Sequence, residues 1–263
     1  MTVQTLTIVT DDGVRLAVEV YGPESAPVLL LSNSLGTTMA MWDPQLADLS
    51  ARYRVVRHDG RGQGQSTCPP GAASMDRLGR DALTVLDALG AARAHFCGLS
   101  MGGMVGQWLA THAPERLLRL VLANTSACMA PAAAWQARLE GVLSHGMGPL
   151  AQASLERWFT PAFLAAEPEQ AEWIRQMLLA NDPQGYAACC AAIRDMDQRR
   201  TAALNTVPTL VIAGQADPAT SVADAQFLVD AAGDARLVTL PAAHLSNVEC
   251  PQQFTQAVID HLG

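Results

Sequence analysis

Residues 98–102 have the sequence Gly-Leu-Ser-Met-Gly, and this pentapeptide constrains the fold more than any other part of the chain. The apolar run 94–97 precedes it, and a segment with helical spacing follows at 104–113. In that context G-x-S-x-G is typical of a sharp strand-to-helix turn, which strains the serine backbone and needs glycine on both sides. We therefore predict that Ser100 projects above a sheet as a nucleophile, beside a helix N-terminus that favours negative charge. The alternative is a glycine-rich helix start without chemistry.

Strand and helix signals alternate along the rest of the chain. Two stretches rich in β-branched residues, 5–10 and 14–20, predict a hairpin around an Asp-Asp-Gly turn. Further apolar runs predict buried strands at 27–32, 54–58, 94–97, 117–123, 208–213 and 236–240. Helical spacing predicts helices at 44–51, 75–89, 104–113, 221–231 and 251–262. Because parallel neighbours require crossover connections, this order predicts an α/β fold with a mostly parallel eight-stranded sheet and helices on both faces.

The segment 124–205 interrupts that alternation. It contains no convincing strand and is rich in alanine, methionine, tryptophan and glutamine. Pieces with helical spacing lie at 131–144, 148–158, 168–180 and 183–194. We interpret 124–205 as a helical cap inserted into a core made of 1–123 and 206–263. With 263 residues, 49% of them hydrophobic, the chain is long enough for one such core.

Composition narrows the range of partners. The formal net charge is -8 and basic residues form no run, so we expect neither nucleic acid nor a membrane surface as a partner. The N-terminus lacks a basic segment followed by an apolar run, and no stretch approaches membrane-spanning length. We therefore expect a cytoplasmic location. The six cysteines show no C-x-x-C spacing, and no other metal-ligand pattern occurs in the sequence. We therefore expect neither a metal nor another cofactor. Assembly into a homo-oligomer stays open.

A nucleophilic serine needs a base, and histidine is the usual one. In this arrangement the chain order is serine, acid, histidine, which leaves as candidates His112, His145, His244 and His261. We favour His244 because it lies in a loop after the last predicted strand, whereas the others fall in predicted helices or in the cap. Asp217 follows the strand 208–213 and is the predicted acid. An ordinary Asp-Pro turn is the alternative for that position.

Two hydrogen-bond donors are needed for the oxyanion that forms when serine attacks an acyl carbon. The backbone amide of Met101, directly after Ser100, is the first. By analogy with folds of this kind, the amide of Leu35 in the loop after strand 27–32 is the second. Ser34 and Gly36 would let that loop turn close to the nucleophile. A plain turn of small polar residues is the alternative.

The sequence resembles the 3-oxoadipate enol-lactonases of the β-ketoadipate pathway, which have the α/β-hydrolase fold. The resemblance covers nearly the whole chain, and its features lie at 31–37, 41–43, 94–103, 116–122, 156–161, 185–195 and 243–249. G-x-S-x-G occurs in many esterases and lipases, whereas the cap stretches and the histidine loop are far more specific. Gln63 is one departure, because related enzymes often have histidine there. Since that histidine has no catalytic role in the family, we expect the change to affect turn packing only.

The resemblance implies a serine hydrolase that opens 3-oxoadipate enol-lactone to 3-oxoadipate through an acyl-enzyme, in the degradation of protocatechuate and catechol. Such a small anionic lactone has a carboxylate that needs a cationic partner. The cap offers four arginines, Arg138, Arg157, Arg175 and Arg194. We favour Arg138 as that partner, with Trp135 on the same helical face and Trp158 as a further apolar wall. The alternative is that Arg138 is an exposed arginine without a ligand and that the two tryptophans pack the cap against the core.

Other functions stay open at this point. A general carboxylesterase, or a perhydrolase-like relative, would share Ser100, Asp217 and His244 but accept uncharged esters. A carbon-carbon bond hydrolase of similar fold is a further alternative. A non-catalytic ligand receptor, with the cap as a binding lid, is less favoured because all three residues are present. A dehalogenase is disfavoured because its nucleophile would be an aspartate at the position of Ser100.

Overall fold

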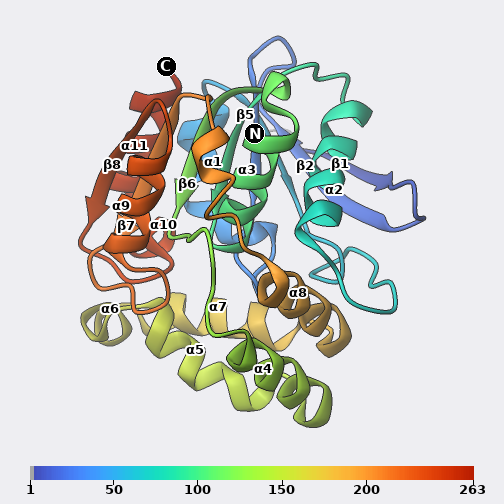
Figure 1. Cartoon of the computed structure of the whole chain (residues 1–263), viewed down its shortest axis with the longest axis vertical. Helices are drawn as coiled ribbons and strands as arrows, with labels where there is room; N and C mark the ends of the chain where they lie inside the picture. The colour runs from blue at the N-terminus through green and yellow to red at the C-terminus, as the bar shows by residue number, and fades with distance from the viewer. Residues whose placement is uncertain (1–2) are drawn as a thin grey trace.

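Eight strands form one sheet in the computed structural model, which describes residues 3–263 (Figure 1). Their bounds are Val3–Val9 (β1), Arg15–Tyr21 (β2), Val28–Ser32 (β3), Arg54–His58 (β4), Ala94–Leu99 (β5), Leu117–Ala123 (β6), Thr209–Gly214 (β7) and Ala235–Leu240 (β8). The order across the sheet is β1-β2-β4-β3-β5-β6-β7-β8. Strand β2 is antiparallel to both neighbours, whereas every pair from β4 to β8 is parallel. The predicted α/β fold with a mostly parallel eight-stranded sheet is confirmed.

Burial along each strand follows its place in the sheet. Strand β2 buries Leu16, Val18 and Val20 and leaves the residues between them at least partly exposed, so its alternating pattern belongs to a sheet with one covered face. Strand β5 lies in the middle and is buried at all six positions, which agrees with its continuous apolar sequence. The predicted hairpin joins β1 to β2 through a turn in which Gly13 has φ +83°.

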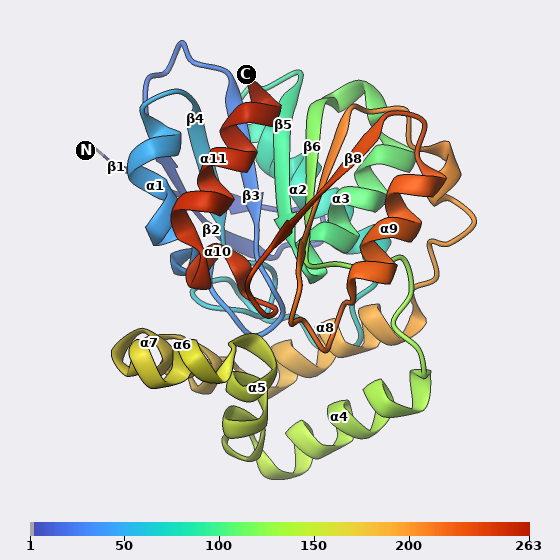
Figure 2. The ribbon, with the colours of Figure 1, turned by 90° about the vertical axis from the view of Figure 1, so that its left-hand side faces the viewer.

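Helices cover both faces of the sheet (Figure 2). The longer core helices are α1 (Asp43–Ser50), α2 (Met75–Ala88), α3 (Met101–His112), α9 (Val222–Ala231) and α11 (Pro251–Leu262). Helices α1 and α11 pack together on one face, and α2, α3 and α9 lie on the other. Helix α3 begins at once after Ser100, three residues before the predicted start. Two glycines in its first turn, at 102 and 103, have low helix propensity and hide this start in the sequence.

Five further helices lie together beside one edge of the sheet, and we call them the cap (Figures 1 and 2). They are α4 (Ala132–His145), α5 (Ala151–Trp158), α6 (Pro161–Ala166), α7 (Pro168–Leu179) and α8 (Pro183–Asp195). Helix α4 packs against α8, and α5 against α7. Helix α6 was not predicted, although Thr160 caps its N-terminus and Pro161 occupies its first position. Both are ordinary start signals, but the helix that they start has only six residues, Pro161 included.

Shorter helices complete the described chain. The 3₁₀ helices are η1 (Met39–Trp42), η2 (Pro114–Arg116), η3 (Gly148–Leu150) and η4 (Ala202–Leu204), and one α-helical turn is α10 (Ser246–Glu249). Because β3 to β8 are parallel, the loops that follow β3, β5, β6, β7 and β8 leave the sheet at the same edge. This is the edge that faces the cap (Figure 1). Loops at the carboxyl ends of parallel strands are where open α/β sheets bind their ligands.

Candidate active site

Ser100 stands at the turn between β5 and α3 with φ +58° and ψ −114°. A side chain at either flanking glycine would collide with backbone. A Cβ added at Gly98 would lie 2.1 Å from the carbonyl oxygen of Gly102. A Cβ added at Gly102 would lie 2.1 Å from the carbonyl oxygen of Ser32. Positive φ is rare outside glycine, and a strained residue persists only where the surrounding structure holds it. The close packing around Ser100 does this. The turn predicted from the pentapeptide is therefore present.

Ser100, His244 and Asp217 form one hydrogen-bonded chain. The Ser100 Oγ and the His244 Nε2 are 2.9 Å apart, and the His244 Nδ1 and the Asp217 Oδ2 are 2.8 Å apart. All three residues are buried, with exposed fractions of 8%, 4% and 7%. In this arrangement His244 can accept the serine proton at Nε2 while Asp217 holds the proton on Nδ1. Residues far apart in the sequence are thus brought together as the sequence predicted.

The Asp217 carboxylate has more partners than the histidine alone. Its Oδ1 accepts from the backbone amides of Ala219, at 2.8 Å, and Thr220, at 3.1 Å. Its Oδ2 also accepts from the Thr220 hydroxyl, at 2.7 Å, and from the Asn124 side-chain nitrogen, at 3.0 Å. Burial opposes ionisation of this group, but His244 and these donors outweigh it and lower the pKa of Asp217 to about 2. The carboxylate is therefore ionised at neutral pH.

Asn124 is a residue of this site that sequence reasoning missed. It follows β6 with φ +44°, and its side-chain nitrogen also donates to the Ala243 carbonyl oxygen at 3.1 Å. Its side-chain oxygen accepts from the Ser246 hydroxyl at 2.5 Å. Asn124 thus links the acid to both ends of the histidine loop. The only signal in the sequence was its position at the carboxyl end of a central strand.

The loop after β3 also lies beside Ser100. Gly102 donates its backbone N–H to the Asn33 carbonyl oxygen at 3.0 Å, which fixes this loop against the start of α3. Gly36 has φ +81°, and an added Cβ there would lie 2.7 Å from the Leu178 side chain. Met101 opens α3, so its N–H has no acceptor within the helix. Among residues 3–263 the Leu35 N–H has no acceptor either. These two free amides are the predicted oxyanion donors, and that role stays a prediction.

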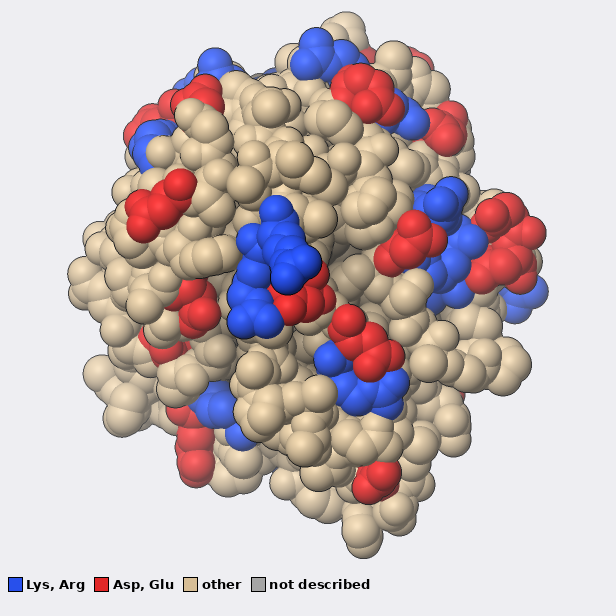
Figure 3. Space-filling view, in the orientation of Figure 1, with Lys and Arg blue, Asp and Glu red and all other residues tan. Residues whose placement is uncertain are grey.

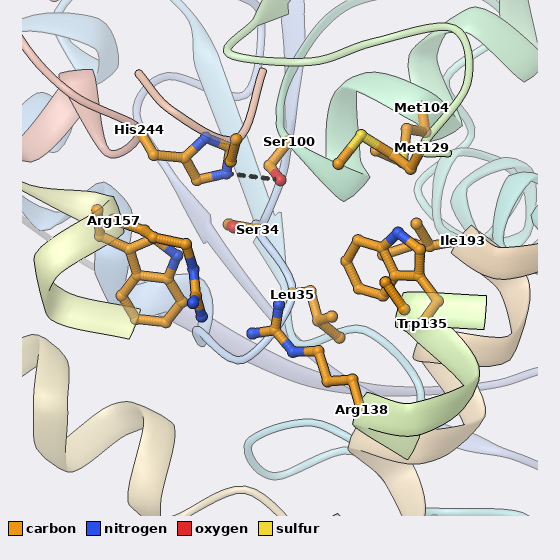
Figure 4. Close-up of a pocket in the computed structure, with 13 residues that line it drawn as sticks. Ser34, Leu35, Ser100, Met104, Met129, Trp135, Arg138, Arg157, Ile193 and His244 are labelled. Atoms are coloured by element: carbon orange, nitrogen blue, oxygen red, sulfur yellow. Dashed lines mark hydrogen bonds between the residues drawn. The ribbon is translucent and has the colours of Figure 1, made fainter. Parts of the chain in front are cut away.

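A cavity of about 250 Å³ lies between this site and the cap. Ser100, His244 and Leu35 line its core side. The cap side includes the three predicted substrate-binding residues, which are Trp135, Arg138 and Trp158. It also includes Arg157, which was considered in the sequence but not favoured. Figure 4 shows the guanidinium groups of Arg138 and Arg157 directed into the space opposite Ser100.

Neither of these two arginines has a carboxylate partner in the described part of the chain. Arg157 donates to the Ser154 hydroxyl at 3.3 Å, and the Nε of Arg138 is buried without a hydrogen-bond partner. The Arg138 guanidinium lies over the rings of Trp135 and Tyr186, at 5.3 and 5.5 Å from their centroids. Burial and the Arg138 charge both lower the pKa of Arg157. A buried anion in the cavity would relieve the repulsion between the two cations.

The other two cap arginines point elsewhere. Arg175 pairs with Glu172 at 3.0 Å on the surface of α7. Arg194 pairs with Asp195 at 2.7 Å at the end of α8. A carboxylate already neutralises each of them, so they are not available to a ligand in the way that Arg138 and Arg157 are. The packing of the cap helices on one another and on the core decides which arginines face the cavity, and no sequence pattern reports that packing.

The remaining histidine candidates have ordinary structural contacts. His112, His145 and His261 each contact a backbone carbonyl oxygen, those of Trp108, Gly141 and Pro208 respectively.

Charged side chains on the face shown in Figure 3 form small groups of both signs. Within residues 3–263, no helix is long and apolar enough to cross a membrane. In the same range, no three or more His, Cys, Asp or Glu side chains group so that they could hold a metal ion.

Comparison with known proteins agrees with this geometry. A sequence profile of the alpha/beta hydrolase fold matches residues 27–251. The 3-oxoadipate enol-lactonase 2 of Acinetobacter baylyi is 44% identical over 249 residues, which cover 95% of this chain and 93% of that protein. The crystal structure of the enol-lactonase from Burkholderia xenovorans LB400 superposes with a TM-score of 0.95 at 40% identity, covering 98% and 99% of the two chains. RutD of Stutzerimonas stutzeri, whose name refers to carbamate hydrolysis, is 32% identical over 90% of this chain and 92% of its own.

The chain therefore belongs to the α/β-hydrolase family and, within it, to the group that contains the 3-oxoadipate enol-lactonases. As a member of that group it is an enzyme of the hydrolase class.

Proposed function

We propose that this enzyme hydrolyses 3-oxoadipate enol-lactone to 3-oxoadipate, with Ser100 as nucleophile, His244 as base and Asp217 as the acid that orients the histidine. The observation that carries the proposal is the cavity between Ser100 and two arginines, Arg138 and Arg157, which have no carboxylate partner among residues 3–263; such a cavity suits a small ester with one free carboxylate. The names and the identity of the relatives support the same substrate. We place the reaction in the cytoplasmic degradation of aromatic compounds.

The first half of the reaction opens the ring. Ser100 loses its proton to the His244 Nε2 and attacks the lactone carbonyl carbon. The amides of Leu35 and Met101 hold the oxyanion of the tetrahedral intermediate. Collapse of this intermediate breaks the bond between the acyl carbon and the ring oxygen. The leaving group is an enolate, which is a weaker base than an alkoxide and takes the proton from His244.

The second half releases the product. The enol is still tethered to the acyl group and could close the ring again. Its conversion to the ketone removes the nucleophilic oxygen, so the acyl-enzyme persists until water reaches it. His244 takes a proton from that water, the hydroxide attacks the acyl carbon, and Ser100 leaves with a proton from His244. Asp217 stabilises the imidazolium in both halves and keeps the proton on Nδ1.

The arginines would recognise the substrate rather than take part in the chemistry. The carboxymethyl arm of the lactone carries its negative charge away from the carbonyl that Ser100 attacks. Arg138 and Arg157 face Ser100 across the cavity, so they can hold the arm while the ring carbonyl meets the nucleophile (Figure 4). Trp135 and Trp158 would form apolar walls around the ring.

The test compares specificity constants for freshly generated 3-oxoadipate enol-lactone, for p-nitrophenyl acetate and for a small carbamate. We expect a strong preference for the lactone, and no turnover of it by Ser100→Ala, which should keep the melting temperature of the wild type. A preference for p-nitrophenyl acetate would make the enzyme a general esterase. A preference for the carbamate would place it with RutD. Turnover of the lactone by Ser100→Ala at the wild-type rate would remove Ser100 from the mechanism.

A further inference from the structure

The cap contacts the core loops at two places close to the proposed catalytic groups. One contact reaches the loop that carries His244, and the other reaches the loop that carries Leu35. Both loops line the cavity beside Ser100, and in the proposed reaction they supply different parts, the base and an oxyanion donor. The hydrogen bonds at these two places couple the cap to both of them.

Glu249 makes the contact at the histidine loop. Its carboxylate accepts from the Ala243 backbone N–H at 2.9 Å, directly before His244. The same carboxylate accepts from the Thr160 backbone N–H, at 3.3 and 3.4 Å from its two oxygens, and from the Thr160 hydroxyl. Thr160 belongs to the cap, where it starts α6. One carboxylate therefore joins the residue before the base to the cap.

A backbone contact strengthens this junction. The Leu245 N–H donates to the Trp158 carbonyl oxygen at 3.0 Å, so the residue after His244 is also bound to the cap. Trp158 is the last residue of α5, and Arg157 lies one position before it. His244 is thus held on both sides by the segment that carries Arg157 and Trp158 into the cavity. A shift of this segment would move the base and the cavity wall together.

Asn181 makes the contact at the oxyanion loop. It is buried in the turn after α7, and its side-chain nitrogen donates to the Gly36 carbonyl oxygen at 2.9 Å. The same nitrogen donates to the carbonyl oxygens of Met177, at 2.7 Å, and Leu178, at 3.4 Å. Only the nitrogen of a side-chain amide can donate, so these three acceptors determine which way the amide points. Gly36 follows Leu35 directly, and its position fixes the orientation of the peptide beside the Leu35 amide.

We propose that Glu249 and Asn181 are positioning residues through which the cap holds the base and the oxyanion loop in register around Ser100. This inference rests on the proposed serine-hydrolase mechanism and adds a role for the cap beyond substrate recognition. It follows that the cap contributes to the chemical step for every substrate, including esters too small to reach Arg138 or Arg157. A displacement of about 1 Å of a catalytic group can reduce a rate by about 100-fold.

The two side chains can be changed with little change of shape. Glu249→Gln keeps the length but turns one acceptor into a donor, which then faces the N–H of Ala243 or Thr160. Asn181→Asp keeps the size but sets a carboxylate against carbonyl oxygens. Thr160→Val and Asn181→Ser weaken the same contacts more mildly and serve where the first pair does not fold.

The experiment measures the burst and the steady state of p-nitrophenyl acetate hydrolysis, together with lactone hydrolysis and the melting temperature. The burst amplitude counts functional active sites, so kcat is obtained per folded enzyme. We expect each variant to lose kcat on both substrates by the same factor, between about 10-fold and 100-fold, with KM little changed. Arg138→Ala differs from this pattern, because it should affect the lactone alone.

Matched controls separate positioning from mere stability. Glu156→Gln changes a glutamate of α5 whose carboxylate accepts, as far as residues 3–263 show, from Gln152 alone, on the same helix. Asn205→Ala removes a buried asparagine that bonds Val207 and Thr209, away from both loops. We expect these controls to keep the wild-type kcat per active site even if they melt earlier. Wild-type kcat per active site in the Glu249 and Asn181 variants would overturn the inference, while an inactive Ser100→Ala would leave the proposed function standing.

Discussion

Single residues with unusual backbone conformations mark the two strand ends at the centre of the site. Ser100 and Asn124 are the non-glycine residues with positive φ in the described range 3–263, and they follow the neighbouring strands β5 and β6. Ser100 presents the hydroxyl, while Asn124 binds the acid and the histidine loop. Strained residues of this kind persist where the surrounding structure holds them, and they are concentrated at functional sites. Here the strain lies at the proposed nucleophile and at the residue that links Asp217 to the histidine loop.

Asp217 makes the stability of the folded enzyme depend on pH in the acid range. Its pKa is about 2 when folded, against 3.8 ordinarily, so the unfolded chain takes up the proton first as the pH falls. The stabilisation of about 2 kcal/mol is complete above pH 5 and is lost between about pH 4 and pH 2. We expect the free energy of unfolding to drop between pH 5 and pH 3 by about 1 kcal/mol more in the wild type than in Asp217→Asn. Urea unfolding at both pH values measures this, and equal drops would show that the pKa of Asp217 is not lowered.

The sequence predicts the residues of the site that local patterns reveal. Ser100 sits between glycines that its turn requires, and His244 and Asp217 follow strands in the expected order. Asn124 and Thr220 escape prediction because their contacts with Asp217 depend on how separate loops meet. Asn124 is a common residue type after a strand, and nothing near it in the sequence indicates a partner 93 positions away.

At the level of elements, two cap helices contribute one arginine each to the same cavity. Arg138 comes from α4 and Arg157 from α5, and both face the core. Helix α4 is the outermost of these, and it buries only Val142 fully. The inner face of α4 lines the cavity and packs against α8. The sequence predicts these helices by periodicity and favours Arg138, which shares a helical face with Trp135, but it gives no reason to favour Arg157, because the inward direction of Arg157 depends on how the helices pack together.

Removal of either arginine should weaken lactone hydrolysis selectively. A hydrogen bond to a charged group is worth about 1.5–3 kcal/mol, so Arg138→Ala and Arg157→Ala should each lower kcat/KM for the lactone by about 10-fold to 100-fold. The double variant should lose less than the product of both factors, since the two arginines would share one carboxylate. Arg175→Ala, on the surface of α7, is the control. Equal losses on p-nitrophenyl acetate would contradict a role in binding the carboxylate.

Helix α8 approaches the core so closely that it needs a glycine. An added Cβ at Gly185 would lie 1.9 Å from the Gly62 carbonyl oxygen, and Gly62 itself has φ +72°. We expect Gly185→Ala to destabilise the protein by about 1–3 kcal/mol, because the backbone would have to move apart. Gly141→Ala in α4 is the opposite case, with nothing within 4 Å of the added Cβ, and should stabilise by about 0.4–1 kcal/mol. Thermal melting of both variants checks this, and equal shifts would contradict it.

For the whole molecule, the cap and the sheet share one hydrophobic core. Val142, Ile174 and Leu178 of the cap belong to the same buried cluster as Leu30 and Phe96 of the sheet. The sequence predicts an inserted helical segment, because strand signals stop at residue 123 and resume at 208. How firmly that segment is joined to the core depends on long-range contacts, which periodicity does not report. Coupled packing of this kind favours unfolding as one unit.

We therefore expect a single unfolding transition in urea. Trp42 and Trp108 report on the core, whereas Trp135, Trp158 and Trp173 report on the cap. Far-ultraviolet circular dichroism, tryptophan fluorescence and residual esterase activity should give coincident curves with the same midpoint. Fluorescence that changes at lower urea than the circular dichroism would show a cap that unfolds by itself.

The cap lies between two neighbouring strands of the sheet: it begins after Ala123 at the carboxyl end of β6, and the chain re-enters the sheet at Thr209 of β7, which pairs with Leu120 of β6. An insertion between two such fixed strands can change its length at little entropic cost, about 0.6 kcal/mol for each doubling. A different cap could therefore replace this one on the same sheet, through evolution or engineering, and change which carboxylate-bearing substrates the enzyme accepts. Under the coupling proposed above, such a graft would reach the full kcat only if it brought a hydroxyl to the place of Thr160 and an amide to the place of Asn181.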